Sequence, residues 1–526
     1  MQIIDARRDV DGAIEMHCDI CIVGAGAAGL YLATCLTEHD VRVIVLEAGG
    51  QDCVDQASIG FESIQSAAFY KGADEGRAFG LGGTTALWGG VLAPYTQRDL
   101  RSEKQEHIDT WQDIVRRVDL HKAEVLKRLG FHNQEGGHYF NVKRVASTST
   151  SSGVNSLDIL TAEMMPFRTR KLSSLPKKSG DSRKSLKVFL NAVVKDWEIS
   201  ESRSPSVVGA VCCQAGNNEL KVYADSFVVA AGTIESTRIL LEIQRSGDIE
   251  ALTVNDTLGF YLGDHLSCAI AIPKASNFAQ TVEQFGPIFV NGKMKSFRFV
   301  ERNAAENSAR YFAHFIFDQD NAGFRVAKQA LAALQARSKT EISVSELNRG
   351  VAGLIGLAWY RFANSKLYIP KGTPIRLQLD IEQQPSRRNR ISLGDDIDQF
   401  GRPVAVIDWD VRAEDFHAVE ETTCRLLELW PNNDETMPSI LPLRGSQIES
   451  PHGTYHPVGT CRMGPKKGDV VGRDLKVNGT ENLYVLSTAV FPSAGTANPT
   501  FSMFCFGEAL VHTLLGSTDS CGIAGG

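Results

Sequence analysis

The chain has 526 residues, of which 43% are apolar and 22% charged, with a formal net charge of -7. This length is too great for one compact core, so we expect two large domains or one domain with an extensive second lobe. The composition is that of a globular protein and excludes wholesale disorder. The acidic balance leaves no basic surface of the kind that binds a phosphate backbone, so nucleic acid is not expected as a partner.

Membrane and export signals are weak throughout the sequence. The first 16 residues lack the apolar stretch of a secretory signal. Val351–Ala363 is apolar but too short to span a bilayer and is interrupted by Arg361, so we interpret it as a segment that is buried or covers a pocket. The 11 cysteines are scattered and odd in number, which favours a reducing compartment. We therefore predict a cytoplasmic protein with no transmembrane segment.

A dinucleotide-binding unit is predicted near the amino terminus. An apolar run over residues 19–23 leads into G-x-G-x-x-G, a helical stretch over 30–36 and a second apolar run over 41–46. In such a unit the glycines allow a tight turn and a close approach to a pyrophosphate at the helix amino terminus, and an acid follows the second strand to bind ribose hydroxyls. The residues that fit these roles are Gly24, Gly26, Gly29 and Glu47.

The motif alone does not separate NAD from FAD. A flavin reductase that is fed by a nicotinamide would carry a second G-x-G-x-x-G unit, and none follows Gly50. We therefore expect FAD, with the substrate as the reductant. The run over 227–233 predicts a strand that ends in small residues, Ala231 and Gly232, where the backbone can pass close to a dinucleotide.

The predicted fold class is α/β, with a Rossmann-like, doubly wound FAD-binding domain. Its α+β second lobe is a discontinuous substrate domain built on an antiparallel sheet, because aromatic-rich runs such as residues 296–300 and 311–317 have the composition of strands. We assign residues 15–101, 187–265 and 450–526 to the FAD-binding domain, 102–186 to an insertion or cap, and 266–449 to the substrate-binding domain.

Several separated blocks, in order, resemble the glucose–methanol–choline (GMC) oxidoreductase family. They are CIVGAGAAGLYLA with LEAGG at 21–50, GLGGTTALWGG at 80–90, VVAAGTIESTRILL at 228–241, LGFYLGDHL at 258–266, YHPVGTCRMG at 455–464 and NLYVLSTAVFPSAGTANPT at 482–500. The first block alone is weak evidence, whereas the ordered set is specific and spans nearly the whole chain. The stretch 381–411 further resembles bacterial members with sugar-like or steroid-like substrates.

The resemblance implies roles for particular residues. Some members tether FAD through a histidine in the second block, where this chain has Leu87, so non-covalent FAD is implied. The implied catalytic pair is His456 and Asn498, the second position being His in some members and Asn in others. His265 is implied to give structural support. The residues implied to lie beside the cofactor are Gly82, Gly83, Thr84, Thr85, Val194, Pro499 and Thr500.

The chemistry of alcohol oxidation suits the implied pair. Histidine is a base whose ordinary pKa lies near neutral pH, and an asparagine amide can donate a hydrogen bond to a developing alkoxide. Each residue also has a purely structural alternative: His456 could be a satisfied loop histidine, and Asn498 could form an Asx turn before Pro499. No H-E-x-x-H motif is present, and His452 lies in a glycine-containing loop, so no metal is expected.

We therefore predict FAD-dependent oxidation of a CH–OH group to an aldehyde or ketone, by proton abstraction and hydride transfer to flavin N5. The resemblance favours a sugar-like or polyhydroxylated small-molecule alcohol, and a glycosidic intermediate of secondary metabolism is one candidate. Oxygen or a soluble carrier would accept the electrons. The alternatives are a non-redox lyase of the same fold and an FAD-binding subunit that needs a partner; the oligomeric state stays open.

Overall fold

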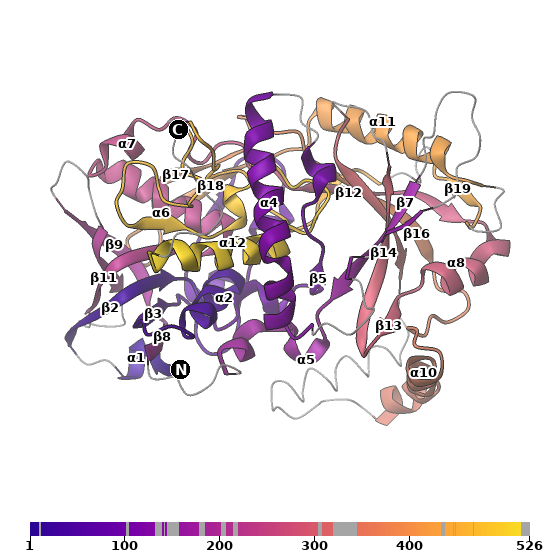
Figure 1. Cartoon of the computed structure of the whole chain (residues 1–526), viewed down its shortest axis with the longest axis horizontal. Helices are drawn as coiled ribbons and strands as arrows, with labels where there is room; N and C mark the ends of the chain where they lie inside the picture. Colours follow the sequence, from indigo (N-terminus) through magenta and orange to yellow (C-terminus); the bar gives the residue numbers. More distant parts are fainter. Residues whose placement is uncertain are drawn as a thin grey trace.

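The chain is described by a computed structural model in which two lobes lie side by side (Figure 1). The structure describes residues 1–516 except for 10–11, 101–104, 132–138, 141, 145–156, 178–184, 201–206, 214–218, 303–307, 319–343, 433–436, 445–446, 448 and 467. One lobe contains both the first and the last ordered elements of the chain, and the other is built around the middle of the sequence.

The first lobe is built on an eight-stranded sheet with the order β1-β8-β3-β2-β11-β10-β9 and with β21 beside β11. Its strands are parallel except for β10, which pairs antiparallel with both neighbours. The strands are β1 (Gln2–Asp5), β2 (Ala13–Val23), β3 (Val43–Leu46), β8 (Leu186–Leu190), β9 (Val193–Ile199), β10 (Val207–Cys213), β11 (Glu219–Val229) and β21 (Leu483–Val485). The predicted α/β class is confirmed, although β2 begins six residues before the predicted run because it pairs with β11 along its whole length.

Helices pack on this sheet, as expected for a mostly parallel sheet. Helix α2 (Ala27–Leu36) follows the glycine motif and packs against α12 (Pro499–Leu514), which in turn contacts α4 (Gln105–Arg128). Nearly every side chain of α12 before His512 is buried, including Phe501, Phe504 and Phe506. A helix that is apolar on all sides must be enclosed in this way. Helix α12 therefore carries the carboxyl-terminal residues into the centre of the first lobe (Figure 1).

The second lobe is built on a ten-stranded antiparallel sheet with the order β19-β12-β16-β15-β14-β7-β5. Alternate side chains of β12, β14, β15 and β16 form an apolar core with α11 (Ala413–Leu429), whereas their other side chains are mostly polar. The strands are β5 (Val91–Leu92), β6 (Val142–Arg144), β7 (Leu157–Met164), β12 (His265–Pro273), β13 (Ile288–Val290), β14 (Lys293–Glu301), β15 (Tyr311–Phe317), β16 (Ile375–Glu382), β19 (Ile440–Pro442) and β20 (His452–Gly453).

Shorter elements complete the two lobes. A small sheet of β17 (Arg390–Ile397), β18 (Pro403–Asp408) and β4 (Ser63–Gln65) lies beside α6 (Gly232–Ser246). The remaining elements are the helices α1 (Ala6–Asp9), α3 (Gln56–Ile59), α5 (Phe167–Arg170), α7 (Glu250–Thr253) and α8 (Phe278–Phe285), with the 3₁₀ helices η1 (Lys71–Ala73), η2 (Gly83–Ala86), η3 (Gln97–Leu100), η4 (Leu172–Lys177), η6 (Ala275–Asn277) and η8 (Thr488–Val490).

The apolar segment Val351–Ala363 lies in helix α10 (Val344–Ala363) at the edge of the second lobe. In the described structure Ile355, Trp359 and Phe362 are exposed, so the prediction of a buried segment is wrong for these side chains. No helix within the described ranges combines the length and the apolar character that crossing a bilayer requires.

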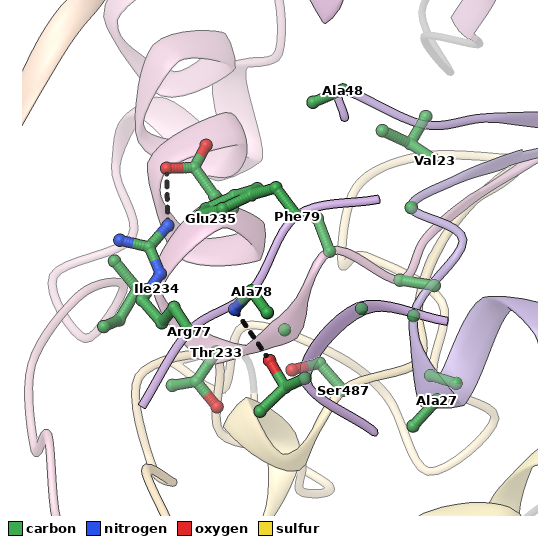
Figure 2. A pocket seen from close by; sticks show the side chains of 18 of the residues that line it. Val23, Ala27, Ala48, Arg77, Ala78, Phe79, Thr233, Ile234, Glu235 and Ser487 are labelled. Carbon is green, nitrogen blue, oxygen red and sulfur yellow. Dashed lines mark hydrogen bonds and ion pairs between the residues drawn. The ribbon is translucent and has the colours of Figure 1, made fainter. Parts of the chain in front are cut away.

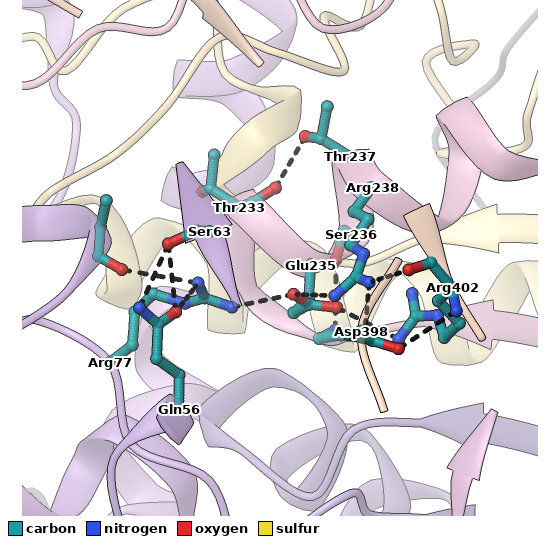
Figure 3. Close-up of polar contacts among 12 residues, drawn as sticks. Gln56, Ser63, Arg77, Thr233, Glu235, Ser236, Thr237, Arg238, Asp398 and Arg402 are labelled. Atoms are coloured by element: carbon teal, nitrogen blue, oxygen red, sulfur yellow. Dashed lines mark hydrogen bonds and ion pairs between the residues drawn. The ribbon is translucent and has the colours of Figure 1, made fainter. Parts of the chain in front are cut away.

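A buried network of ion pairs joins helix α6 to the loop before η2 and to the β17–β18 hairpin (Figure 3). Glu235, in the first turn of α6, pairs with Arg77 at 3.0 Å and with Arg402 at 3.5 Å. Arg238, which is fully buried on the same helix, pairs with Asp398 at 2.7 Å. Burial raises the pKa of Glu235, but the charges of the three arginines outweigh it and lower that pKa to about 2. The network therefore holds the loop before η2 and the β17–β18 hairpin on one helix.

We expect this network to make stability depend on pH in the acid range. The pKa of Glu235 is depressed from 4.5 to about 2, so the unfolded chain binds its proton first and stability is lost as the pH falls between these values. Glu235→Gln should lower the free energy of unfolding at pH 7 by roughly 3 to 5 kcal/mol, because it leaves the buried guanidinium of Arg77 without its carboxylate partner. Urea titrations at pH 7, 4.5 and 3 measure both effects.

The matched control is Glu250→Gln, which changes an exposed glutamate at the start of α7. This variant should keep the stability and the pH slope of the wild type. An acid slope in Glu235→Gln as steep as that of the wild type would contradict the assignment to Glu235.

Candidate active site

A cavity runs between the glycine motif, the end of β3, the loop before η2 and the start of α6 (Figure 2). Most of the residues predicted to bind the cofactor line it: Gly24, Gly26, Glu47, Gly83, Thr84, Val194, Ala231, Gly232 and Thr500. Four others, Gly29, Gly82, Thr85 and Pro499, lie behind this lining in the described structure. The fold therefore brings together residues from six separate segments around one cavity.

The three motif glycines have different physical roles. A Cβ on Gly29 would lie 1.9 Å from the carbonyl oxygen of Gly24, and a Cβ on Gly24 would lie 2.6 Å from that of Ala230. These two glycines allow backbone to pack on backbone. A Cβ on Gly26 would meet no atom within 4 Å, because this residue faces the cavity at the amino terminus of α2. Unpaired N–H groups and the positive end of the helix dipole make such a position suitable for a phosphate.

Glu47 is almost fully buried and holds the loops around the cavity together. Its carboxylate accepts hydrogen bonds from the backbone N–H groups of Ala25 at 2.7 Å, Gly49 at 2.9 Å and Gly80 at 2.9 Å. Burial raises the pKa of Glu47, and these three bonds oppose that rise. A carboxylate has about four acceptor positions, so one remains for a ribose hydroxyl. Sequence reasoning predicted the ribose contact but missed the three backbone contacts.

In the loop from Gly82 to Thr85, some residues line the cavity and others hold the loop in shape. Thr84 faces the cavity and its hydroxyl accepts from the backbone N–H of Ala78 at 3.3 Å (Figure 2). Thr85 instead donates to the carbonyl of Gly82 at 2.5 Å and accepts from the N–H of Leu172 at 3.1 Å, which shapes the loop. Leu87, at the position where some family members tether FAD, is exposed.

The predicted catalytic pair lies together. Nδ2 of Asn498 is 3.1 Å from Nε2 of His456, although the two residues are 42 positions apart. Asn498 is the N-cap residue of α12, but its side chain makes no capping bond, so the alternative of an Asx turn before Pro499 is not what the structure shows. Both neighbours of His456 in the chain, Tyr455 and Pro457, line the cavity.

Further polar groups surround His456 on the side away from Asn498. Its Nδ1 lies 3.0 Å from Nδ1 of His265 and 3.1 Å from the hydroxyl of Thr454. Its backbone N–H donates to the carboxylate of Asp264 at 2.8 Å, and Nε2 of His265 lies 2.8 Å from the carbonyl oxygen of Gly495. His265, which the resemblance implied as a supporting residue, is thus in direct contact with His456.

Sequence reasoning missed Arg298, which reaches the pair from β14 of the other lobe. Its guanidinium donates to Oδ1 of Asn498 and lies 3.9 Å from the centre of the Phe312 ring. Burial is the larger influence on this group and lowers the pKa of Arg298 to about 10. The sequence did contain a signal for this residue. Arg298 stands between Phe297 and Phe299 in a predicted strand, and neighbouring side chains of a strand point to opposite faces of the sheet.

The surroundings keep His456 neutral. Burial, followed by the positive charges that His265 and Arg298 can carry, lowers the pKa of His456 from 6.5 to about 3. A neutral imidazole has one lone pair and can accept a proton. The arrangement therefore offers an uncharged base and an amide donor that can both reach one oxygen atom.

Comparisons with known proteins assign two parts of the chain to families. Residues 385–507, which include His456 and Asn498, match the family described as GMC oxidoreductase. This part of the chain is a GMC oxidoreductase domain. Residues 22–54, with the glycine motif and Glu47, match an NAD(P)-binding Rossmann-like domain. The resemblance of the sequence to the GMC family is confirmed. The cofactor of GMC oxidoreductases is FAD, as predicted, and the open space at Gly26 and the free acceptor position of Glu47 fit its diphosphate and ribose.

Similar sequences match only parts of the chain. Pyridoxine 4-oxidase of Microbacterium luteolum is 51% identical over 45 residues, which is 9% of each chain. The 6'''-hydroxyparomomycin C oxidase of Streptomyces lividus is 26% identical over 130 residues, 24% of this chain and 23% of that protein. The chain thus aligns with less than a quarter of the length of either relative.

Two solved structures share the fold over nearly the whole chain. A formate oxidase variant from Aspergillus oryzae is 15% identical, with a TM-score of 0.55 over 96% of this chain and 99% of that one. Pyridoxine 4-oxidase from Mesorbium loti is 17% identical, with a TM-score of 0.56 over 94% and 99%. At these identities the comparisons confirm the fold.

The two glycine roles can be separated by adding one methyl group. Gly26→Ala places the methyl in open space at the cavity, so we expect an unchanged free energy of unfolding for the apoprotein and FAD binding weakened by about tenfold or more. Gly29→Ala forces α2 away from the glycine turn and should destabilise the apoprotein by roughly 1 to 3 kcal/mol. Urea titration of the apoproteins and quenching of FAD fluorescence measure the two quantities. Equal effects of both variants on stability would refute the distinction.

Proposed function

We propose that this GMC oxidoreductase oxidises an alcohol CH–OH group with non-covalently bound FAD. The proposal rests on one observation, the 3.1 Å approach of His456 Nε2 and Asn498 Nδ2 next to the cavity that carries the cofactor motif. A substrate hydroxyl placed against both groups would donate to the imidazole and accept from the amide. Bound FAD would accept the hydride of the same carbon.

The residues of the chain then divide the work on the hydroxyl group. His456 takes the proton at Nε2, and its surroundings favour the neutral form that this step needs. Asn498 holds the oxygen through Nδ2 and stabilises the negative charge that grows there. The NH₂ group of Asn498 lies beside His456 and is not used to cap α12. Oxygen or a soluble carrier would take up the electrons.

The polar face of the ten-stranded sheet supports a polyhydroxylated, sugar-like substrate. Next to the catalytic pair this face presents His314 paired with Asp380 at 2.9 Å and Gln378 bonded to Ser267 at 2.9 Å. Such donors and acceptors can also bond substrate hydroxyl groups, of which a sterol has few. The oxidases of pyridoxine and of a hydroxyparomomycin are named for polar substrates of this kind.

The role of His456 is tested by His456→Gln. General-base catalysis contributes roughly 10² to 10⁴ in rate, so we expect anaerobic flavin reduction by a reactive sugar or aminosugar to slow by that factor. Stopped-flow bleaching of the flavin absorbance measures the rate, and the flavin content of the variant is the control for folding. A variant that bleaches at the wild-type rate would remove His456 from the chemistry.

The same assay separates the two rival functions. A non-redox lyase would consume a substrate without any bleaching. A subunit that needs a partner would bind FAD tightly but turn over no alcohol with oxygen or artificial acceptors. Bleaching by at least one alcohol, followed by recovery of the flavin colour in air or with an acceptor, is the result that supports the proposal.

The pH profile gives a second prediction. The pKa of His456 is lowered from 6.5 to about 3, so the base should stay unprotonated as the pH falls through the ordinary histidine range. We expect kcat/KM for the alcohol to change less than about twofold between pH 7 and pH 5.5, where an ordinary histidine would lose most of its free base. A tenfold fall centred near pH 6.5 would contradict the effect of burial on this group.

A further inference from the structure

A continuous series of hydrogen bonds runs through the catalytic pair from one lobe to the other. It begins at the guanidinium of Arg298, which donates to Oδ1 of Asn498. Nδ2 of Asn498 lies 3.1 Å from Nε2 of His456, and Nδ1 of His456 lies 3.0 Å from Nδ1 of His265. The series of hydrogen bonds ends at Gly495, whose carbonyl oxygen lies 2.8 Å from Nε2 of His265.

The donor and acceptor roles at the two ends of this series of hydrogen bonds are fixed. A guanidinium has only donors, so the oxygen of the Asn498 amide must face Arg298 and its NH₂ group must face His456. A carbonyl has only lone pairs, so Nε2 of His265 must carry the hydrogen that Gly495 accepts. In neutral His265, Nδ1 is then an acceptor.

The donor and acceptor roles of the two ring nitrogens of His456 follow from these assignments. Nε2 of His456 faces an NH₂ group and must accept, while Nδ1 of His456 faces an acceptor on His265 and must donate. The hydroxyl of Thr454, 3.1 Å from the same Nδ1, can accept a share of that hydrogen while it donates to Asp264. We infer that Arg298 and the Gly495 carbonyl, acting through Asn498 and His265, hold His456 in the tautomer whose lone pair is on Nε2.

The opposite tautomer conflicts with the structure at two points. A hydrogen on Nε2 of His456 would require the Asn498 amide to turn over, and the NH₂ group would then face the guanidinium of Arg298. The lone pair on Nδ1 of His456 would face that of His265. Leaving such buried groups unsatisfied disfavours this tautomer by about tenfold to a hundredfold.

The position of Arg298 makes it suitable for this role. It lies on β14, which pairs with β7 along eight residues and with β15 at Phe299, so its backbone is fixed by the sheet. Its guanidinium rests on the ring of Phe312 at 3.9 Å and contacts the carbonyl of Thr496 at 3.5 Å. Arg298 is therefore a positioning residue, whose hydrogen bond reaches the base through the amide of Asn498.

The tautomer can be measured without turnover, in holoenzyme with ¹⁵N-labelled histidine, by solid-state NMR at pH 7. The His456 signals are assigned as those that disappear in His456→Gln. For the wild type we expect a neutral ring with hydrogen on Nδ1. In Arg298→Met the amide is free to turn over, and the form with hydrogen on Nε2 should rise from less than about one tenth to a comparable share. The spectrum reports the tautomer directly. The inference therefore rests on the proposed role of His456 only where it links that tautomer to catalysis.

A second variant keeps Arg298 and changes Asn498, which links Arg298 to His456. Asn498→Asp has nearly the same shape, but an ionised carboxylate only accepts, so Nε2 of His456 must carry a hydrogen. Its spectrum should therefore show the opposite assignment to the wild type. Arg425→Met, which removes a cation that pairs with Glu301 at 2.7 Å, is the matched control and should keep the wild-type tautomer.

Several results would overturn the inference. They are hydrogen on Nε2 of His456 in the wild type, an unchanged tautomer in Arg298→Met or in Asn498→Asp, and a change in Arg425→Met equal to that in Arg298→Met. In turnover, Arg298→Met should lower kcat by about tenfold with KM for the alcohol nearly unchanged, whereas loss of a substrate contact would raise KM. If the tautomers behave as expected and no alcohol reduces the flavin, the proposed function fails and the inference stands.

Discussion

The buried carboxylate of Asp264 is the contact on which the catalytic geometry depends. It accepts from the backbone N–H groups of His265 at 2.7 Å and His456 at 2.8 Å and from the hydroxyl of Tyr70 at 2.6 Å. Burial raises the pKa of Asp264, and the three donors oppose that rise. Tyr70 also stacks on Trp409 with ring centres 4.5 Å apart, so one carboxylate ties both histidines to a third segment of the chain. The 3.0 Å contact between the two imidazoles follows from this shared anchor.

The ten-stranded sheet supplies both a core and a site because its side chains alternate. Phe299, Phe315 and Leu379 face α11 and contribute to the apolar cluster, whereas Arg298 and Asp380 lie between such residues in the same strands and point the other way. A shift of one residue in the register of β14 would exchange Arg298 for an aromatic ring at the catalytic pair. The apolar packing that stabilises the lobe therefore also determines which charge reaches Asn498.

The features that could be predicted from sequence are those encoded locally or by the ordered family blocks. The glycine motif and Glu47 lie within 24 residues and specify one βαβ unit by themselves, and the ordered blocks pointed to His456 and Asn498. Arg298 is 200 positions from Asn498, and Tyr70 is 194 positions from Asp264. Both contacts join segments that are far apart in the sequence, and no local pattern specifies them. The exposure of Trp359 was missed for a related reason, since an apolar stretch does not reveal which of its faces finds a partner.

The choice of asparagine at position 498 gains a physical meaning from these contacts. A histidine at this place could donate or accept at either nitrogen, and its tautomer would adapt to its neighbours. An amide has one end that donates and one that accepts, so a single fixed donor on one side determines what the other side presents. Arg298 provides that donor from a rigid strand. Asparagine with a buried arginine behind it therefore gives the site a defined polarity, in which the NH₂ group of Asn498 is directed at the lone pair on Nε2 of His456.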